Sequence, residues 1–240
     1  MFFTVTQIIE QTRKIIILHT NSMNQLERNQ TILRKYIPEK SIGIIAEWIV
    51  KYNFKLKIKK SRSSKEGDYM PPHNGKNHVI TINHDLKKYA FLVTLIHEIA
   101  HLITWEKYKG KVYAHGKEWK SEYSRLINHF LQINSSITDP DKIFPQEIFL
   151  ALKEHMLSPS AASCSDLHLS RVLKKFDPDT DTLLLEKIAT GSSFRIANSR
   201  SKHSSEVFIK GEKRRTRYKC LHASSKREYL IHALCKVAII

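Results

Sequence analysis

The chain has 240 residues, enough for one large domain or for one domain followed by a smaller one. Hydrophobic residues make up 41% and charged residues 26%, a globular composition that excludes a disordered chain. Lysine and arginine total 40 against 23 acidic residues, so the net charge is +17, which favours a polyanionic partner such as nucleic acid. A solvated basic surface without such a partner explains the same charge equally well.

The chain is expected to be cytoplasmic. No apolar run reaches the roughly 20 residues that a membrane helix needs, and no signal-peptide core with a small-residue cleavage site is present. The three cysteines, Cys164, Cys220 and Cys235, lack tight pairing spacing, which favours reduced thiols over a disulfide framework.

Hydrophobic periodicity predicts the elements of the first part of the chain. Residues 1–34 form an N-terminal extension or helix, and Met23 could equally begin the protein, so the status of residues 1–22 is open. After the helix-breaking Pro38, Ser41 is placed to cap the next helix. The elements that follow are a helix from Ser41 to Tyr52, a strand over 54–59, a loop over 61–67, a strand over 78–83, and helices over 86–107 and 116–131.

The character of the sequence changes after a short helix predicted over 148–156. Small and polar residues around Pro159 indicate a linker over 158–170, which separates a domain over 35–157 from a module over 171–240. Residues 186–240 carry 13 lysines and arginines against 4 acidic residues, a net charge of +9. Short β-type runs are predicted there at Ser193–Ile196, Val207–Lys210, Arg217–Leu221 and Glu228–Ile231.

Two candidate metal ligands and the candidate catalytic residue lie in one segment, His97-Glu98-Ile99-Ala100-His101. Residues four apart on a helix share a face, so His97 and His101 can bind one metal ion, for which neutral imidazole is a good ligand. Glu98 is placed to take the proton of a zinc-bound water as that water attacks a peptide carbonyl.

The context of this segment supports a catalytic zinc site over two unrelated surface histidines. The segment lies in a strongly periodic helix, and a third candidate ligand, His115, follows 14 residues after His101, beyond the helix-ending Gly110. Gly116 is expected to let the chain pass close to the metal. Three protein ligands with an open water position are typical of catalytic zinc, whereas a structural site has a fourth protein ligand, and residues 1–163 contain no cysteine to supply one.

The pattern His97-Glu98-Ile99-Ala100-His101-Leu102, Trp105 and His115-Gly116-Lys117-Glu118-Trp119 resembles the SprT-like family of zinc metalloproteases, which includes the eukaryotic protease Spartan. The resemblance covers roughly residues 35–135. It implies one Zn2+ per chain on His97, His101 and His115, with Glu98 as the catalytic residue and Trp105 and Trp119 packing under the site.

The resemblance also implies a fold class and a substrate. The fold is α+β, with a small zincin-type catalytic domain of helices and a short sheet, followed by a small basic β-rich module. In such enzymes an edge strand near the motif helix pairs with extended protein substrate, and the 78–83 strand is the candidate. DNA-associated or DNA-crosslinked proteins are the implied substrates.

The C-terminal module departs from the four-cysteine zinc ribbon that follows many domains of this family. Cys220 stands at a ligand position, but Ala223 replaces its partner and no cysteine lies between Phe194 and Ser201. We expect a basic β-module that keeps the ribbon's shape without its metal. A different site made of Cys220, His222, His232 and Cys235 is the alternative.

Three functions are compatible with the sequence. The first is a zinc endopeptidase, recruited to nucleic acid by its basic surface. The second is a nucleic-acid- or transcription-associated binding protein with a structural or vestigial zinc site, supported by aromatic residues interleaved with the C-terminal charge (Phe194, Phe208, Tyr218 and Tyr229). The third is a metal-dependent hydrolase of a non-protein bond. The oligomeric state is not determined by the sequence.

Overall fold

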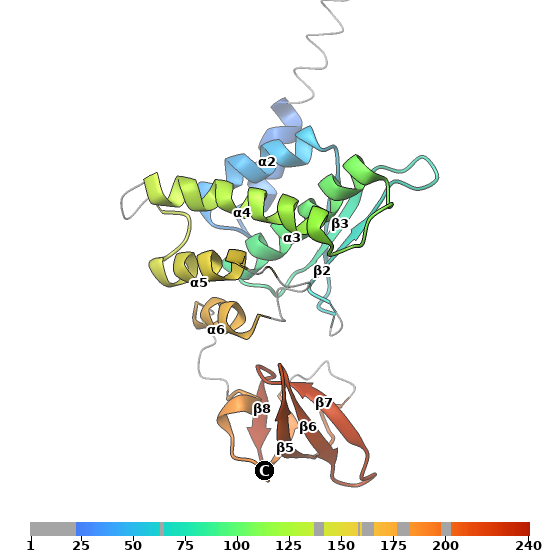
Figure 1. Ribbon diagram of the computed structural model, residues 1–240, viewed down its shortest axis with the longest axis vertical. Helices are drawn as coiled ribbons and strands as arrows, with labels where there is room; N and C mark the ends of the chain where they lie inside the picture. Colours follow the sequence, from blue (N-terminus) through green and yellow to red (C-terminus); the bar gives the residue numbers. More distant parts are fainter. Residues whose placement is uncertain are drawn as a thin grey trace, which may run out of the picture. The chain divides into compact units, whose positions relative to one another are not determined.

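The computed structural model describes residues 23–62, 65–136, 142–157, 159, 166–176, 183–197 and 203–240 (Figure 1). The chain divides into two compact units between Phe149 and Leu150. The fold is α+β, as predicted, with helices and a small sheet in the first unit and a β-rich second unit. The extension over 1–22 and most of the linker over 158–170, including Cys164, lie outside the described residues.

The first unit begins with helical residues 23–33, followed by the 3-10 turn η1 (Glu39–Ser41) and helix α2 (Ile42–Lys51). Buried Leu33, Ile37, Ile45 and Ile49 anchor this region in the core. Ser41 precedes α2 as expected, but the predicted side-chain cap is wrong. Its hydroxyl donates a hydrogen bond to the Pro38 carbonyl at 2.6 Å, because η1 turns the chain back on itself there.

The sheet of the first unit has the order β1-β3-β2, formed by β1 (Lys55–Lys59), β2 (Gly67–Met70) and β3 (Val79–Asn83). Strand β1 runs parallel to β3, and β2 runs antiparallel to it. Two of these strands match the predicted ones, whereas β2 begins at the last residue of the predicted loop and was not predicted.

The prediction that the 78–83 strand is an edge strand is wrong. Strand β3 is central, hydrogen-bonded to β1 on one side and to β2 on the other. Its residues from Ile80 to Asn83 are all buried, which is typical of a strand covered on both faces. The edge strand that packs on the motif helix is β2.

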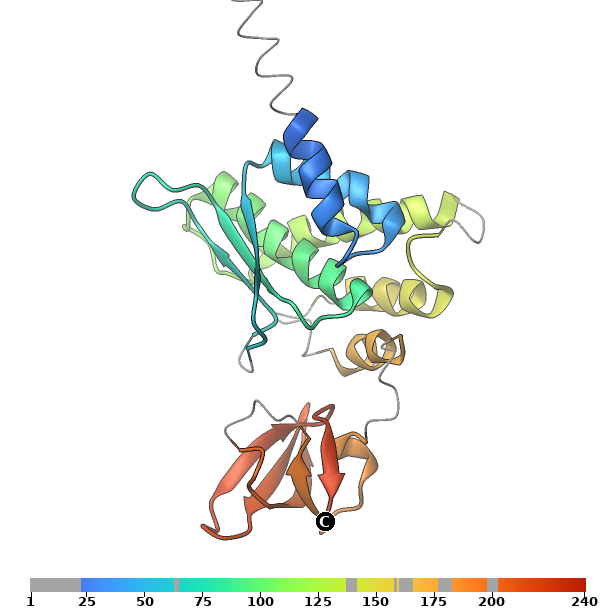
Figure 2. The ribbon, with the colours of Figure 1, turned by 180° about the vertical axis from the view of Figure 1, so that it is seen from behind.

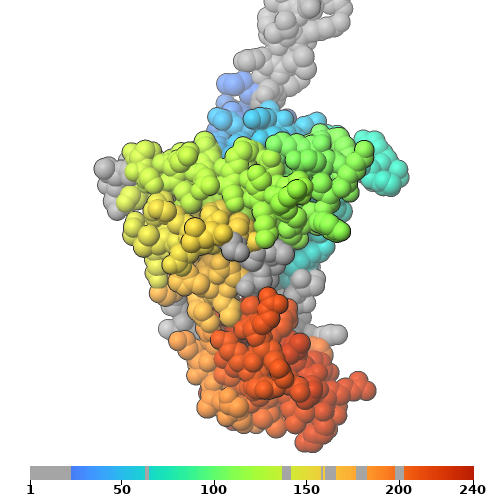
Figure 3. Space-filling model, in the orientation of Figure 1, coloured from blue at the N-terminus to red at the C-terminus, as the bar shows by residue number. Residues whose placement is uncertain are grey.

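Helix α3 (Lys88–Tyr108) is the centre of the first unit, packed on α4 (Lys117–Ser136) and on strands β2 and β3 (Figures 1 and 2). From Phe91 to Thr104 every residue except His101 is buried. On the face shown in Figure 3, α4 forms a band across the unit. The predicted stop is confirmed, because Lys109 and Gly110 have left-handed φ angles of 49° and 78° and end α3.

Helix α5 (Gln146–Leu157) follows, and α6 (Leu167–Lys175) occupies residues that the sequence assigned to the linker and to the start of the module. Asp166 explains where α6 begins. Its carboxylate accepts a hydrogen bond from the Leu169 N–H at 3.0 Å, and its other oxygen contacts His155 Nδ1 at 2.7 Å.

The second unit contains the 3-10 turn η3 (Leu185–Lys187) and an antiparallel sheet of order β7-β6-β5-β4-β8. Its strands are β4 (Ser193–Ile196), β5 (Phe208–Arg214), β6 (Arg217–His222), β7 (Glu228–His232) and β8 (Val237–Ile239). The four predicted runs are confirmed as β4 to β7. Cys220 is a buried free thiol in a core with Phe194, Phe208 and Val237, where it packs as a small apolar side chain.

None of the described helices is long and apolar enough to cross a membrane.

An ion pair ties α6 to η3 within the second unit. The Arg171 guanidinium contacts Glu186 through Nε at 2.9 Å and through Nη2 at 2.7 Å. The hydrogen bonds from Arg171 hold the pKa of the Glu186 carboxyl below its ordinary value.

The variant Glu186→Gln is expected to lower the local stability of this unit by about 1.5 kcal/mol, or about tenfold in amide-exchange protection of β5 and β6 at neutral pH. Because the pKa of Glu186 is lowered on folding, the difference between variant and parent should vanish as the pH falls through that lowered pKa. The control is Glu212→Gln, since the Glu212–Arg214 pair is exposed and should contribute little. Equal effects of the two variants would show that the Arg171–Glu186 ion pair does not stabilise the second unit more than an exposed pair does.

Candidate metal centre

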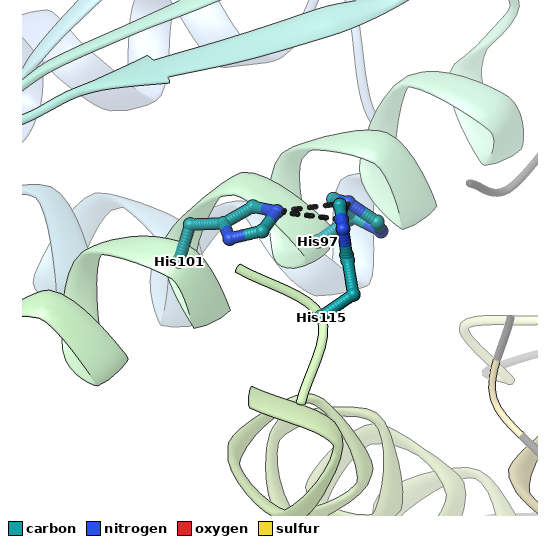
Figure 4. Close-up of side chains that lie close together, drawn as sticks. All are labelled: His97, His101 and His115. Carbon is teal, nitrogen blue, oxygen red and sulfur yellow. Dashed lines mark hydrogen bonds between the residues drawn. The ribbon is translucent and has the colours of Figure 1, made fainter. Parts of the chain in front are cut away.

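Three imidazole rings converge on one point of the first unit (Figure 4). His97 and His101 lie one turn apart on α3, and His115 lies just before α4. The Nε2 atoms are 3.2 Å apart between His97 and His101, 3.0 Å between His101 and His115, and 3.3 Å between His115 and His97.

Hydrogen bonding alone does not account for this triangle. A neutral imidazole nitrogen is either a donor or an acceptor, so among three mutually close Nε2 atoms at least one pair has matching roles. Nitrogens bound tetrahedrally to one zinc at about 2.0–2.1 Å would lie about 3.3 Å apart, close to the spacing found here. The donor set therefore fits a single metal ion, and within the described ranges it is the one group of three or more potential ligands close enough to hold one.

The turn between α3 and α4 brings His115 to the other two imidazoles. After the left-handed pair Lys109 and Gly110, the chain folds back, and the Gly116 N–H donates to the Tyr113 carbonyl at 3.0 Å. A Cβ at position 116 would lie 3.2 Å from that carbonyl oxygen and 3.1 Å from a Glu118 carboxylate oxygen. Gly116 thus permits the tight turn, whereas the sequence suggested a close approach of its backbone to the metal.

Trp119 forms one wall of the site. Its ring centroid lies 4.6 Å from that of His97, 5.2 Å from that of His101 and 4.8 Å from that of His115, and its side chain is fully buried. Tyr123 stacks on the indole at 5.0 Å, and its ring centroid lies 5.6 Å from that of His97. Trp119 therefore packs under the site as predicted, whereas Trp105 packs against His78 at 5.4 Å.

Burial keeps the imidazoles of His101 and His115 neutral. It lowers the pKa of His101 to about 4, with a further contribution from His115, and it also lowers the pKa of His115. Neutral imidazole is the form that binds a metal, so His101 and His115 are in the metal-binding form near neutral pH.

Glu98 is buried, with 7% of its surface exposed, and it follows His97 directly in α3. Its burial, assisted by the negative charge of Asp68, raises the pKa of its carboxyl to about 8. Lys65, Arg62 and a hydrogen bond from the Tyr69 backbone oppose this rise. A divalent cation on the three imidazoles would add positive charge nearby and so also oppose the rise in the pKa of Glu98.

Strand β2 holds the Glu98 side chain in place, and the sequence did not reveal this. A Cβ at position 67 would lie 2.6 Å from Glu98 Oε1 and 2.9 Å from its Cγ, so only glycine fits there with the carboxylate in this position. Two residues further along β2, the Tyr69 backbone binds the same carboxylate.

A second connection fixes β2 to α3. The Tyr69 hydroxyl lies 2.9 Å from His78 Nδ1, and His78 Nε2 lies 2.8 Å from Glu106 Oε1 on α3. Lys109 in turn contacts Glu106 at 2.9 Å. The chain Tyr69–His78–Glu106 thus joins the strand that holds Glu98 to the helix that carries it. No local sequence pattern links these three residues.

The alternative ligand set in the second unit is not assembled. Cys220, His222, His232 and Cys235 are all described, and they do not form a group close enough to share an ion. Cys220 and Cys235 are free thiols, and burial raises the pKa of each.

Comparison with known proteins gives one family. Residues 41–139 match the model described as the SprT-like family. The comparisons with curated proteins and with solved structures gave no match. The matched range includes α3, the turn that follows it and α4, and therefore all three imidazoles and Glu98.

Purified without added metal, the protein is expected to contain about one equivalent of metal per chain by elemental analysis. His101→Ala should lose it, because removal of one of three ligands leaves too few to retain the ion, whereas the exposed-histidine control His84→Ala should keep it. Full metal content in His101→Ala would contradict the site.

Proposed function

We propose that this protein, whose residues 41–139 form a SprT-like family domain, is a zinc-dependent endopeptidase. The observation that carries the proposal is the convergence of three imidazole nitrogens within 3.3 Å of one another, with a buried carboxylate on the residue next to the first of them. His97, His101 and His115 would hold one Zn2+ per chain, and Glu98 would be the catalytic base.

The donor set favours zinc in a catalytic role. Three neutral imidazoles without a carboxylate or thiolate suit Zn2+, and Ca2+ and Mg2+ prefer oxygen ligands. Three protein ligands leave a coordination position for water and substrate, whereas structural zinc sites use four. Bound there, Zn2+ lowers the pKa of water toward about 7 and polarises a carbonyl oxygen.

The protein's own contribution to catalysis is proton transfer by Glu98. Its carboxylate takes the proton of the attacking water and then delivers it to the nitrogen of the leaving amine. The buried surroundings that raise its pKa also strengthen it as a base. Gly67 and the Tyr69 backbone keep the carboxylate oriented during both transfers.

Strand β2 replaces the 78–83 strand as the proposed substrate-binding edge. It is paired with β3 on one side, and its other side has no strand neighbour in the described part of the sheet. An extended protein segment adding to that edge would run past Glu98, which contacts Gly67 of the same strand.

Glu98→Gln is expected to abolish cleavage of a protein substrate while keeping full zinc content, because the amide cannot accept the proton but leaves the three imidazoles intact. The measurement is a casein or histone cleavage assay combined with elemental analysis. Undiminished cleavage by this variant would overturn the mechanism.

Gly67→Ala is expected to lower kcat at least tenfold with zinc retained, because the new methyl group displaces the Glu98 carboxylate. The matched control is Gly43→Ala in α2, where an added Cβ meets nothing within 4 Å and cleavage should be unchanged. Equal cleavage by the two variants would show that β2 does not position Glu98.

A nucleic-acid partner is proposed from the turn between β5 and β6. The turn and the strand ends beside it carry Lys213, Arg214, Arg215 and Arg217, all exposed, and Arg214 lies directly opposite Arg217 in the ladder. Like charges in that position are destabilising, and the contact of Arg214 with Glu212 at 2.6 Å leaves Lys213, Arg215 and Arg217 without a carboxylate ion-pair partner among the described residues. A phosphate backbone would relieve this repulsion, which favours DNA-associated or DNA-crosslinked proteins as substrates.

Replacing Lys213, Arg215 and Arg217 together with glutamine should weaken DNA binding and reduce the salt slope of log K by about 2–3, near 0.9 for each lost phosphate contact. The control is the same change at exposed Lys51, Lys117 and Lys120. Unchanged affinity and an unchanged salt slope would show that these side chains do not contact DNA. DNA binding without any peptidase activity would favour the alternative, a nucleic-acid-binding protein with a structural or vestigial zinc site.

We also propose a cytoplasmic location, because the free thiols of Cys220 and Cys235 suit a reducing compartment.

A further inference from the structure

We propose that a groove beside strand β1 binds an extended acidic segment of a partner protein. This segment adds a strand to the edge of β1 that has no strand neighbour among the described residues. Strand β1 forms one edge of the sheet and β2 the other, so this groove is distinct from the site at Glu98. The proposal does not depend on peptidase activity.

The groove lies between β1 and the N-terminal helical residues, which run side by side in Figure 2. Its volume is about 750 Å³, within the range of pockets that hold ligands. One wall is helical and includes Asn29 and Ile32, and the other is β1 from Lys55 to Ile58, with the turn at 75–77 closing one part.

The backbone of β1 offers hydrogen bonds to the groove. The Lys55 N–H donates to the His78 carbonyl at 2.8 Å, and the Lys59 carbonyl accepts from the His84 N–H at 2.8 Å. In a parallel ladder the alternate residues face the other way, so the N–H and C=O groups of Leu56 and Ile58 point away from β3. An edge of this kind is a template for another strand.

The positive charge of the groove favours an acidic partner segment. Lys55, Lys57 and Lys76 line it, and no acidic residue of the described part of the chain does. No carboxylate among the described residues pairs with these three lysines. Edge lysines repel a second copy of the same lysine-bearing strand, but they attract an acidic one.

The side-chain pattern of β1 indicates which side chains the bound partner segment would carry. Lysines 55, 57 and 59 occupy one face of the strand, and Leu56 and Ile58 occupy the other. A paired strand with alternating acidic and aliphatic side chains would match both faces. The groove wall adds Ile32, which is 51% exposed, and the buried amide nitrogen of Asn29, which has no hydrogen-bond partner among the described residues.

The first test is fluorescence anisotropy with the full chain and a labelled nonapeptide of alternating glutamate and valine, whose intact mass is checked after each titration. Saturable binding is expected, and Lys55→Glu, Lys57→Glu and Lys76→Glu combined should weaken it at least tenfold. The control changes Lys51, Lys117 and Lys120 to glutamate and should leave binding unchanged. A peptide with lysine in place of glutamate should bind at least tenfold more weakly.

The second test separates strand addition from simple charge attraction. Methylating the backbone nitrogens of one alternate set of peptide residues should abolish binding, and methylating the other set should not, because only one set faces β1. Equal affinity of the two methylated peptides would overturn the proposal. An affinity that the three lysine changes leave unchanged would also overturn it. If the peptide binds only after residues 1–22 are removed, the chain's own N-terminal segment is the occupant and the proposal is wrong.

Discussion

The burial of α3 is the constraint on which the first unit depends. A helix enclosed from Phe91 to Thr104 must be covered on all sides, and the sheet and α4 provide that cover. Polar groups in such a helix are costly unless they are paired. His97 and Glu98 are the buried ionisable residues of α3, and their partners come from His115, Trp119 and strand β2. The helix that organises the core is thus the helix that organises the candidate site.

The parts of the site with a local signature could be predicted from the sequence. Two histidines four residues apart share a helix face, and Gly110 marks the place where the chain must turn before His115. Strands β1 and β3 were recognisable from their alternating or β-branched residues. The family resemblance rested on the same residues, and it is supported by the match over 41–139.

The parts that depend on distant pairing could not be predicted. Strand β2 is four residues long and lacks β-branched side chains, so nothing local distinguishes it from a loop. Its packing on α3 beside β3 gives Gly67 its contact with Glu98 and links Tyr69 to Glu106 through His78. The order β1-β3-β2 is equally non-local, which is why the 78–83 strand was mistaken for an edge. In the second unit, β8 has only three residues and is defined by its pairing with β4.

The most direct test of the central claim is zinc K-edge X-ray absorption on the full chain loaded with one equivalent of Zn2+. A first shell of nitrogen and oxygen at about 2.0–2.1 Å, with the outer-shell scattering of about three imidazoles, is the predicted result. A sulfur shell near about 2.3 Å would contradict the account, because it would place the ion on Cys220, Cys235 or Cys164 and leave His97, His101 and His115 without a metal.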